Sequence, residues 1–136
     1  MEILKNFLIL FLLSTSLISC KQHLERNEKM TNLISTGSTY WISDEKIYIL
    51  EENATNGDKN SAFKLYQYHM FVSLDKDLEF TWLEIAAKNG HPIAQSNLAD
   101  LFFTQGNKEK AIFWAKKAYR NGAKLPDELK ILININ

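Results

Sequence analysis

The clearest indication of the fold is residues 82–122, WLEIAAKNGHPIAQSNLADLFFTQGNKEKAIFWAKKAYRNG, because this stretch ends by repeating its own beginning. Similar residues and dipeptides lie 32 positions apart in and before it: Trp82 and Trp114, Ala86 and Ala118, Asn89-Gly90 and Asn121-Gly122, Ala62 and Ala94, Tyr66 and Leu98, and Met70 and Phe102. A further dipeptide, Asn56-Gly57, lies 33 positions before Asn89-Gly90. A period of this length is typical of stacked helical repeats.

Each repeat has the apolar spacing of two helices. In the first helix apolar residues recur at every fourth position: Ala62, Tyr66 and Met70 in one repeat, and Ala94, Leu98 and Phe102 in the next. In the second helix a tryptophan is followed four positions later by an alanine, which lets two backbones approach closely. The glycine after this helix can take the left-handed conformation that ends a helix. The sequence therefore predicts an all-α fold, a short solenoid of helix-turn-helix repeats.

Start and stop signals place the repeat domain at residues 43–136, with repeats at about 57–89 and 90–122. Ser43 and Asn107 are expected N-caps, and Pro92 suits the first position of a helix. Besides the two helices that carry the tryptophans, helices are expected over residues 44–56, 61–73, 92–104 and 125–133. Because a solenoid generally needs about three repeats, we expect the first and last of these four helices to cap the stack.

Residues 1–19 have the features of a secretory signal peptide. Lys5 supplies a positive charge, and the apolar run Phe7–Leu13 is too short to span a membrane. Leu17-Ile18-Ser19-Cys20 resembles the lipobox of bacterial lipoproteins, whose cysteine becomes the lipidated first residue of the mature chain. The alternatives are a classical signal peptide and an ordinary buried thiol at Cys20, which is the only cysteine.

The lipobox resemblance implies a membrane anchor at Cys20. The lysine that follows it, in place of an aspartate, implies a bacterial outer membrane lipoprotein that faces the periplasm. Residues 20–42 are expected to form a flexible tether, because they mix charged and small polar residues without apolar periodicity. At the end of the tether, Tyr40, Trp41 and Ile42 are expected to dock onto the repeat domain.

The charges balance overall but not along the chain. The 16 basic and 16 acidic residues give no indication of nucleic-acid binding. Residues 44–84 carry nine acidic and four basic side chains, whereas residues 88–130 carry eight basic and four acidic ones. A partner could recognise this asymmetry, and solvated faces of opposite sign are the alternative explanation.

No motif typical of catalysis or metal binding is present. The histidines at 23, 69 and 91 are scattered, and one cysteine is too few for a thiolate zinc site. Neither a Gly-x-Ser-x-Gly motif nor a phosphate-binding loop occurs. Asp75-Lys76-Asp77 lacks the glycine and glutamate of a calcium loop and is expected to cap a helix. We therefore expect no enzyme, with no catalytic residue, no metal, no cofactor and no small-molecule substrate.

The repeat resembles the Sel1-like repeat family, a relative of tetratricopeptide repeats. The residues that fit its pattern are Gly57, Asp58, Ala62, Val72, Asp75, Trp82, Ala86, Ala87 and Gly90 in one unit, and Gly90, His91, Ala94, Gln95, Leu98, Lys110, Ala111, Trp114, Lys117, Ala118 and Gly122 in the next. The chain departs from the pattern by lacking the glycine-rich loop, with Phe71 at a usual glycine position and Glu79 in place of the alanine before the tryptophan.

This resemblance implies a concave surface, lined by the first helix of each repeat, that binds another protein. The positions left free by the packing stripes are the expected partner-binding residues: Lys64, Tyr68, Phe71, Asn97, Asp100 and Phe103. Aromatic residues beside polar groups are favoured at interface centres. The alternative for Phe71 and Phe103 is burial between neighbouring repeats.

Small outer-membrane lipoproteins with such repeats resemble immunity proteins of type VI secretion lipase effectors. The resemblance implies a periplasmic inhibitor that binds a secreted phospholipase toxin and blocks its active site. The competing expectation is an envelope scaffold or adaptor that binds a resident envelope protein. A lipid or small-ligand carrier would need an enclosed apolar cavity, for which two packed repeats leave little room.

Overall fold

The computed structural model describes residues 38–135, and it is helical apart from short connections. The predicted signal peptide, Cys20 and most of the predicted tether lie outside the described residues. One compact unit begins at Tyr40. Its helices are α2 (Asp44–Thr55), α3 (Lys59–Tyr68), α4 (Lys76–Lys88), α5 (Pro92–Thr104), α6 (Lys108–Arg120) and α7 (Asp127–Leu132), and α3 continues into a π-helical turn, His69–Ser73. The predicted all-α fold class is confirmed.

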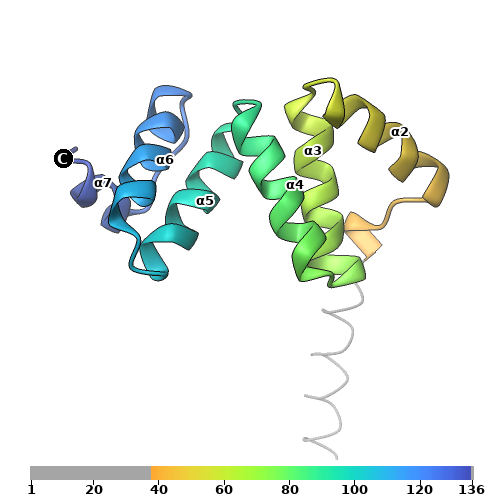
Figure 1. The fold of residues 1–136 in the computed structure, drawn as a ribbon, viewed down its shortest axis with the longest axis horizontal. Helices are drawn as coiled ribbons and strands as arrows, with labels where there is room; N and C mark the ends of the chain where they lie inside the picture. Colours follow the sequence, from red (N-terminus) through yellow and green to blue (C-terminus); the bar gives the residue numbers. More distant parts are fainter. Residues whose placement is uncertain (1–37, 136) are drawn as a thin grey trace, which may run out of the picture. The chain divides into compact units, whose positions relative to one another are not determined.

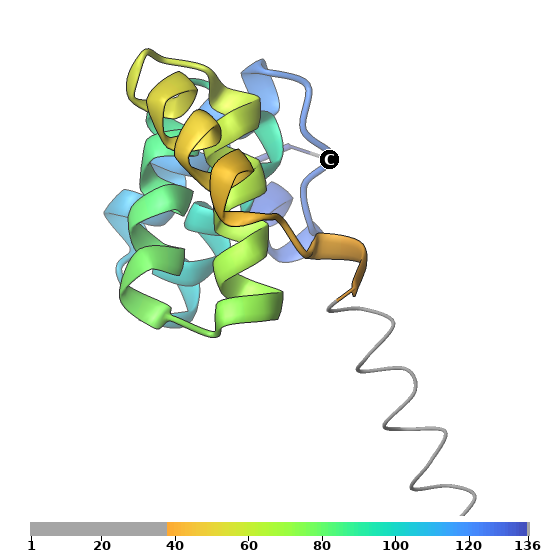
Figure 2. The ribbon, with the colours of Figure 1, turned by 90° about the vertical axis from the view of Figure 1, so that its right-hand side faces the viewer.

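Consecutive helices pack against one another from α2 to α7. Figure 1 shows them in a row in chain order, with the turns after α2, α4 and α6 at the same edge. Figure 2 looks along this row and shows α4 and α6 on one side, with α3 and α7 on the other. The unit is therefore a stack of helical hairpins in which first and second helices take opposite sides.

The three Asn-Gly turns explain why the repeats share one geometry. Gly57, Gly90 and Gly122 have φ values of +97°, +89° and +81°, which place each in the left-handed region as predicted. Side chains other than glycine rarely adopt this conformation, so each glycine ends its helix at little cost. The backbone N–H after each glycine then bonds to a carbonyl of the preceding helix, as His91 does with Ala86 at 2.9 Å.

The core is made of small and large residues in alternation, as the period predicts. Ala62, Ala94, Ala86 and Ala118 are all 0% exposed, so the helices approach closely at these positions. The two tryptophans of the period are buried and fill the wider gaps, and the buried core continues from Leu50 in α2 to α7.

Side-chain amides link each repeat to the one before it. Asn89 donates from Nδ2 to the carbonyl of Ala54, at 3.3 Å. The corresponding Asn121 donates instead to Oε1 of the buried Gln95, at 2.8 Å, and Gln95 donates from Nε2 to the carbonyl of Ala87, at 2.9 Å. Asn89 therefore bonds directly to the backbone of the preceding unit, whereas Asn121 is connected to it through Gln95.

Several predicted boundaries differ from the structure. Ser43 stands at the N-cap of α2 but makes no side-chain capping bond. α3 begins at Lys59 because Asp58 accepts hydrogen bonds from the backbone of Asn60 and Ser61, two residues earlier than predicted. The predicted helix end at residue 73 is reached through the π-helical turn, after which Leu74 takes a left-handed φ of +57°.

The segment before α2 docks only in part. Tyr40 stacks on Phe71, with ring centroids 4.5 Å apart, and Ile42 packs against the core. Trp41, in contrast, is 64% exposed, so the prediction that it docks is wrong. The direction of its side chain depends on the turn into α2, which no local pattern reveals.

The last predicted helix is shorter than expected. α7 covers Asp127–Leu132, whereas the prediction was residues 125–133. Leu125, Leu129 and Ile133 are nevertheless buried against the core. The segment therefore covers the end of the stack, as a capping element should.

Candidate functional site

Three residues of α5 form a stripe that points away from the core. Ile93, Asn97 and Asp100 are spaced by four and three positions, so they share one face of the helix. Ile93 is 53% exposed, Asp100 is exposed and Asn97 is half-buried. The face is free because Ala94 and Leu98, both fully buried, turn the opposite side of α5 into the core.

A groove of about 590 Å³ lies between the N-terminal half of α5 and the segment that follows α6. Its lining is mainly apolar and consists of Pro92, Ile93, Ser96, Asn97, Gly122, Ala123, Lys124 and Pro126. Asn97 donates from Nδ2 to the hydroxyl of Tyr66 at 3.4 Å, which connects this groove to the preceding repeat. Burial raises the pKa of Tyr66, and the hydrogen bond from Asn97 offsets part of that effect.

A second groove, of about 380 Å³, lies at the other end of α5. It is lined by Phe103, Lys108, Glu128, Ile131 and Leu132, so that α7 forms one of its walls. Phe103 is half-buried against the core, whereas Ile131 is 74% exposed. The groove thus combines apolar side chains with one positive and one negative group.

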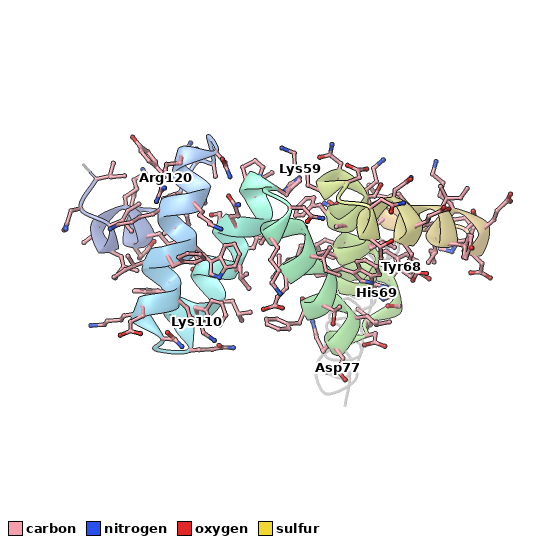
Figure 3. All side chains as sticks on the ribbon, turned by 45° about the horizontal axis from the view of Figure 1, so that its top comes forward. Lys59, Tyr68, His69, Asp77, Lys110 and Arg120 are labelled. Atoms are coloured by element: carbon pink, nitrogen blue, oxygen red, sulfur yellow. The ribbon has the colours of Figure 1, made fainter. Side chains whose placement is uncertain are left out.

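The residues predicted on α3 and on the π-helical turn that follows it are not part of either groove. Lys64 is exposed. Tyr68 is half-buried and meets the ring of His69 edge to face, with centroids 5.1 Å apart (Figure 3). One face of the Phe71 ring is covered by Tyr40, so Phe71 is half-buried. Of the six predicted binding residues, the structure therefore places Asn97, Asp100 and Phe103 along one helix and separates the other three from them.

The π-helical turn buries a histidine whose ring is only partly satisfied. Nδ1 of His69 lies 2.7 Å from the hydroxyl of Ser73, and among the described residues Nε2 has no hydrogen-bond partner. Burial lowers the pKa of His69, and the nearby carboxylates of Asp75 and Glu51 raise it by less. The imidazole is therefore held in its neutral form, which suits a packed side chain better than a surface contact.

This arrangement is suited to binding another molecule. Apolar grooves with a few polar groups are typical of surfaces that receive side chains of another molecule. Within residues 38–135, no three or more His, Cys, Asp or Glu side chains lie close enough to hold a metal ion. Over the same part of the chain, no helix has the length and apolar composition needed to cross a membrane.

The main binding features that the sequence did not reveal are the groove walls. Ala123, Lys124 and Pro126 belong to a connection, and Ile131 belongs to the short α7. Their approach to α5 depends on how the chain turns back after Gly122. The exposed Ile93 could have been found, because an isoleucine directly after Pro92 falls outside the apolar stripe of its helix.

Fold and site define the class as an all-α helical-hairpin repeat protein with a grooved surface on one side. Comparison with known proteins finds 34% identity over 106 residues to the uncharacterized protein YibG of Escherichia coli (strain K12), covering 73% of this chain and 68% of YibG. The chain therefore belongs to the same family as YibG. No protein-family profile matches the chain, and no solved structure is significantly similar to it.

Proposed function

We propose that this protein is a protein-binding module of the Sel1-like repeat type, and that it binds its partner along α5. The observation that supports this most directly is the pair of grooves at the two ends of one exposed helical stripe. Ile93 and Ile131 each expose a large apolar side chain at a groove. Isolated apolar residues on a surface need no explanation, but two beside neighbouring grooves favour a partner.

The chemistry of the site indicates what such a partner presents. Each groove is large enough for one or two apolar side chains, and Asn97 and Asp100 lie between them as hydrogen-bonding groups. A helix or loop of the partner with two apolar side chains and a hydrogen-bond donor between them would fill both grooves and bond to the polar groups. Interfaces of this kind derive most of their affinity from a few buried anchors.

The partner class that the repeat resemblance favours is a secreted phospholipase or lipase toxin, which the protein would neutralise by blocking its active site. In this proposal the lipid anchor at Cys20 holds the module at the outer membrane, where it meets the incoming toxin from the periplasmic side. The basic second half of the repeat domain and its acidic first half would speed the encounter with a charged partner.

The test is a titration of the full-length chain, in mild detergent, into the lipase encoded by a neighbouring gene while phospholipid hydrolysis is followed. Hydrolysis should fall to zero at equal stoichiometry. Ile93→Asp and Asp100→Lys should each weaken inhibition by about tenfold or more, because they place charge in an apolar contact or reverse the charge of the stripe.

Phe80→Ala is the matched control, because Phe80 is an exposed aromatic residue of α4 outside both grooves, and it should leave inhibition unchanged. Lipase turnover that is unaffected by saturating chain would rule out the toxin partner. Capture of resident envelope proteins that depends on Ile93 and Asp100 would instead support an envelope scaffold that uses the same surface.

A further inference from the structure

Two helices at corresponding positions of the stack carry opposite charges. α2 and α6 are second helices that each end at an Asn-Gly turn, and the turns lie 65 positions apart. At this separation Tyr48 of α2 corresponds to Phe113 of α6. Both rings face solvent, with 70% and 52% of their surfaces exposed. An exposed aromatic residue therefore occupies this position in α2 and α6, whereas the corresponding residue of α4 is Thr81.

The charges around the two rings are reversed. α2 carries four carboxylates and one lysine, whereas α6 carries five cations and one carboxylate. Three acidic residues of α2 correspond to three lysines of α6 at the separation of 65: Glu45 to Lys110, Glu51 to Lys116, and Glu52 to Lys117. We define the acidic face as these three glutamates with Tyr48, and the basic face as these three lysines with Phe113.

Neither face is neutralised within its own chain. The ion pairs formed by described residues are Lys76–Glu79, Lys88–Glu84 and Lys130–Asp127, and none of them involves α2 or α6. Lys117 instead lies over the rings of Phe113 and Trp114, with Nζ 4.7 and 5.2 Å from their centroids. Figure 1 shows α2 and α6 separated by α3, α4 and α5, so the two faces of one chain do not meet.

We propose that the acidic face of α2 in one copy packs against the basic face of α6 in a second copy. The aromatic rings supply an apolar centre, and the flanking charges pair across the interface as they do beside the apolar seam of a coiled coil. Each copy carries one face of each sign, so a reciprocal pair uses both faces of both copies and closes as a dimer.

The charge pattern favours a second copy over an anionic membrane. A membrane would attract the basic face with Phe113 as an apolar anchor, but it would repel the acidic face and leave Tyr48 unexplained. Only a partner with the reversed pattern satisfies both faces, and the chain itself has that pattern. The α5 stripe and its grooves lie outside this contact, so the inference does not depend on the proposed function.

The test uses the full-length chain in mild detergent, measured by light scattering after gel filtration at about 100 µM, well above a micromolar Kd. The wild type should be dimeric. Glu45→Lys with Glu52→Lys makes both faces basic, and Lys110→Glu with Lys116→Glu makes both acidic, so each variant alone should be monomeric. All four residues are exposed, so the fold should tolerate the changes.

Mixing the two variants should restore a one-to-one dimer, because every contact then joins opposite charges. This rescue separates the proposal from a folding defect, which mixing cannot repair. Raising the salt concentration from about 0.05 to 0.5 M should weaken the wild-type dimer about tenfold. Lys59→Glu with Lys64→Glu on α3 changes the net charge equally and should leave the dimer intact.

A wild type that stays monomeric overturns the proposal. If that monomer binds phosphatidylglycerol vesicles, and Lys110→Glu with Lys116→Glu abolishes this binding, the basic face is a membrane contact instead. A dimer that survives both charge reversals overturns it as well. So does a mixture of the two variants that remains monomeric.

Discussion

At the scale of single residues, the histidines show how burial in this small stack is coupled to protonation. Burial is the largest cause of the lowered pKa of both His69 and His91. His91 also accepts the N-capping hydrogen bond of α5 through Nδ1, at 3.2 Å from the backbone nitrogen of Ala94, and stacks on Phe63. Protonation of Nδ1 would remove that acceptor, so both rings are suited to the neutral form.

The pH dependence of stability follows from the lowered pKa values of these two histidines. A histidine whose folded pKa lies below the ordinary value of about 6.5 binds fewer protons in the folded state than in the unfolded state. Stability is therefore complete above pH 6.5 and falls as the pH drops below it. We expect the free energy of unfolding, from urea titrations at about pH 7.5 and 5.5, to be lower at the acidic pH.

His69→Gln and His91→Asn should each reduce that difference, and asparagine at position 91 keeps a capping acceptor. The third histidine, His23, lies outside the described residues, and His23→Gln measures how much of the difference arises there. An unchanged difference in both the position 69 and the position 91 variants would contradict the assignment of the effect to these rings.

At the scale of elements, local chemistry determines most helix ends but not all of them. Pro92, Asn107 and the Asn-Gly turns could be assigned from the sequence because each satisfies or removes a backbone group by itself. Ser43 has the right residue type but makes no capping bond. The π-helical turn after α3 was not foreseeable either, since an extra residue per turn depends on how His69 and Phe71 pack.

The two predicted caps form a matched pair for experiment. Asn107 accepts from the backbone nitrogen of Lys110 at 3.2 Å, so Asn107→Ala should destabilise the domain by about 1 kcal/mol. Ser43 makes no such bond, so Ser43→Ala should change stability by no more than about 0.3 kcal/mol. Urea unfolding followed by circular dichroism measures both, and equal effects would contradict the capping geometry described here.

At the scale of the whole molecule, the repeat period predicted the stack, but it could not predict the grooves. Asn97, Asp100 and Phe103 were identified because they fall outside the packing stripe of α5. The walls that face them come from residues 122–126 and from α7, and apart from Gly122 these residues are not part of the repeated pattern that the sequence reveals. Tyr40, which covers Phe71, likewise precedes the first full repeat. The candidate site was therefore predictable where it lies within a repeat and not where the ends of the stack complete it.

α7 should contribute to stability and to binding through different residues. Leu129 is 0% exposed, so Leu129→Ala should reduce the free energy of unfolding by about 2–4 kcal/mol. Ile131 is 74% exposed, so Ile131→Ala should cost less than about 0.5 kcal/mol while weakening partner binding at the second groove. Chemical denaturation gives both energies. Similar losses of stability in the two variants would show that α7 does not cap the stack as described.

The amide links between repeats have a consequence for how such a chain can change its length. Asn89 bonds to a main-chain carbonyl of α2, and Gln95 bonds to one of α4 while it accepts the amide of Asn121 from its own repeat. In these amide links every side chain comes from the incoming repeat, and the preceding unit supplies only main-chain carbonyls. Duplication or loss of a whole unit in evolution would therefore leave these amide links intact, whereas the contacts of Asn97 with Tyr66 and of His91 with Phe63 also need matching side chains in the preceding unit.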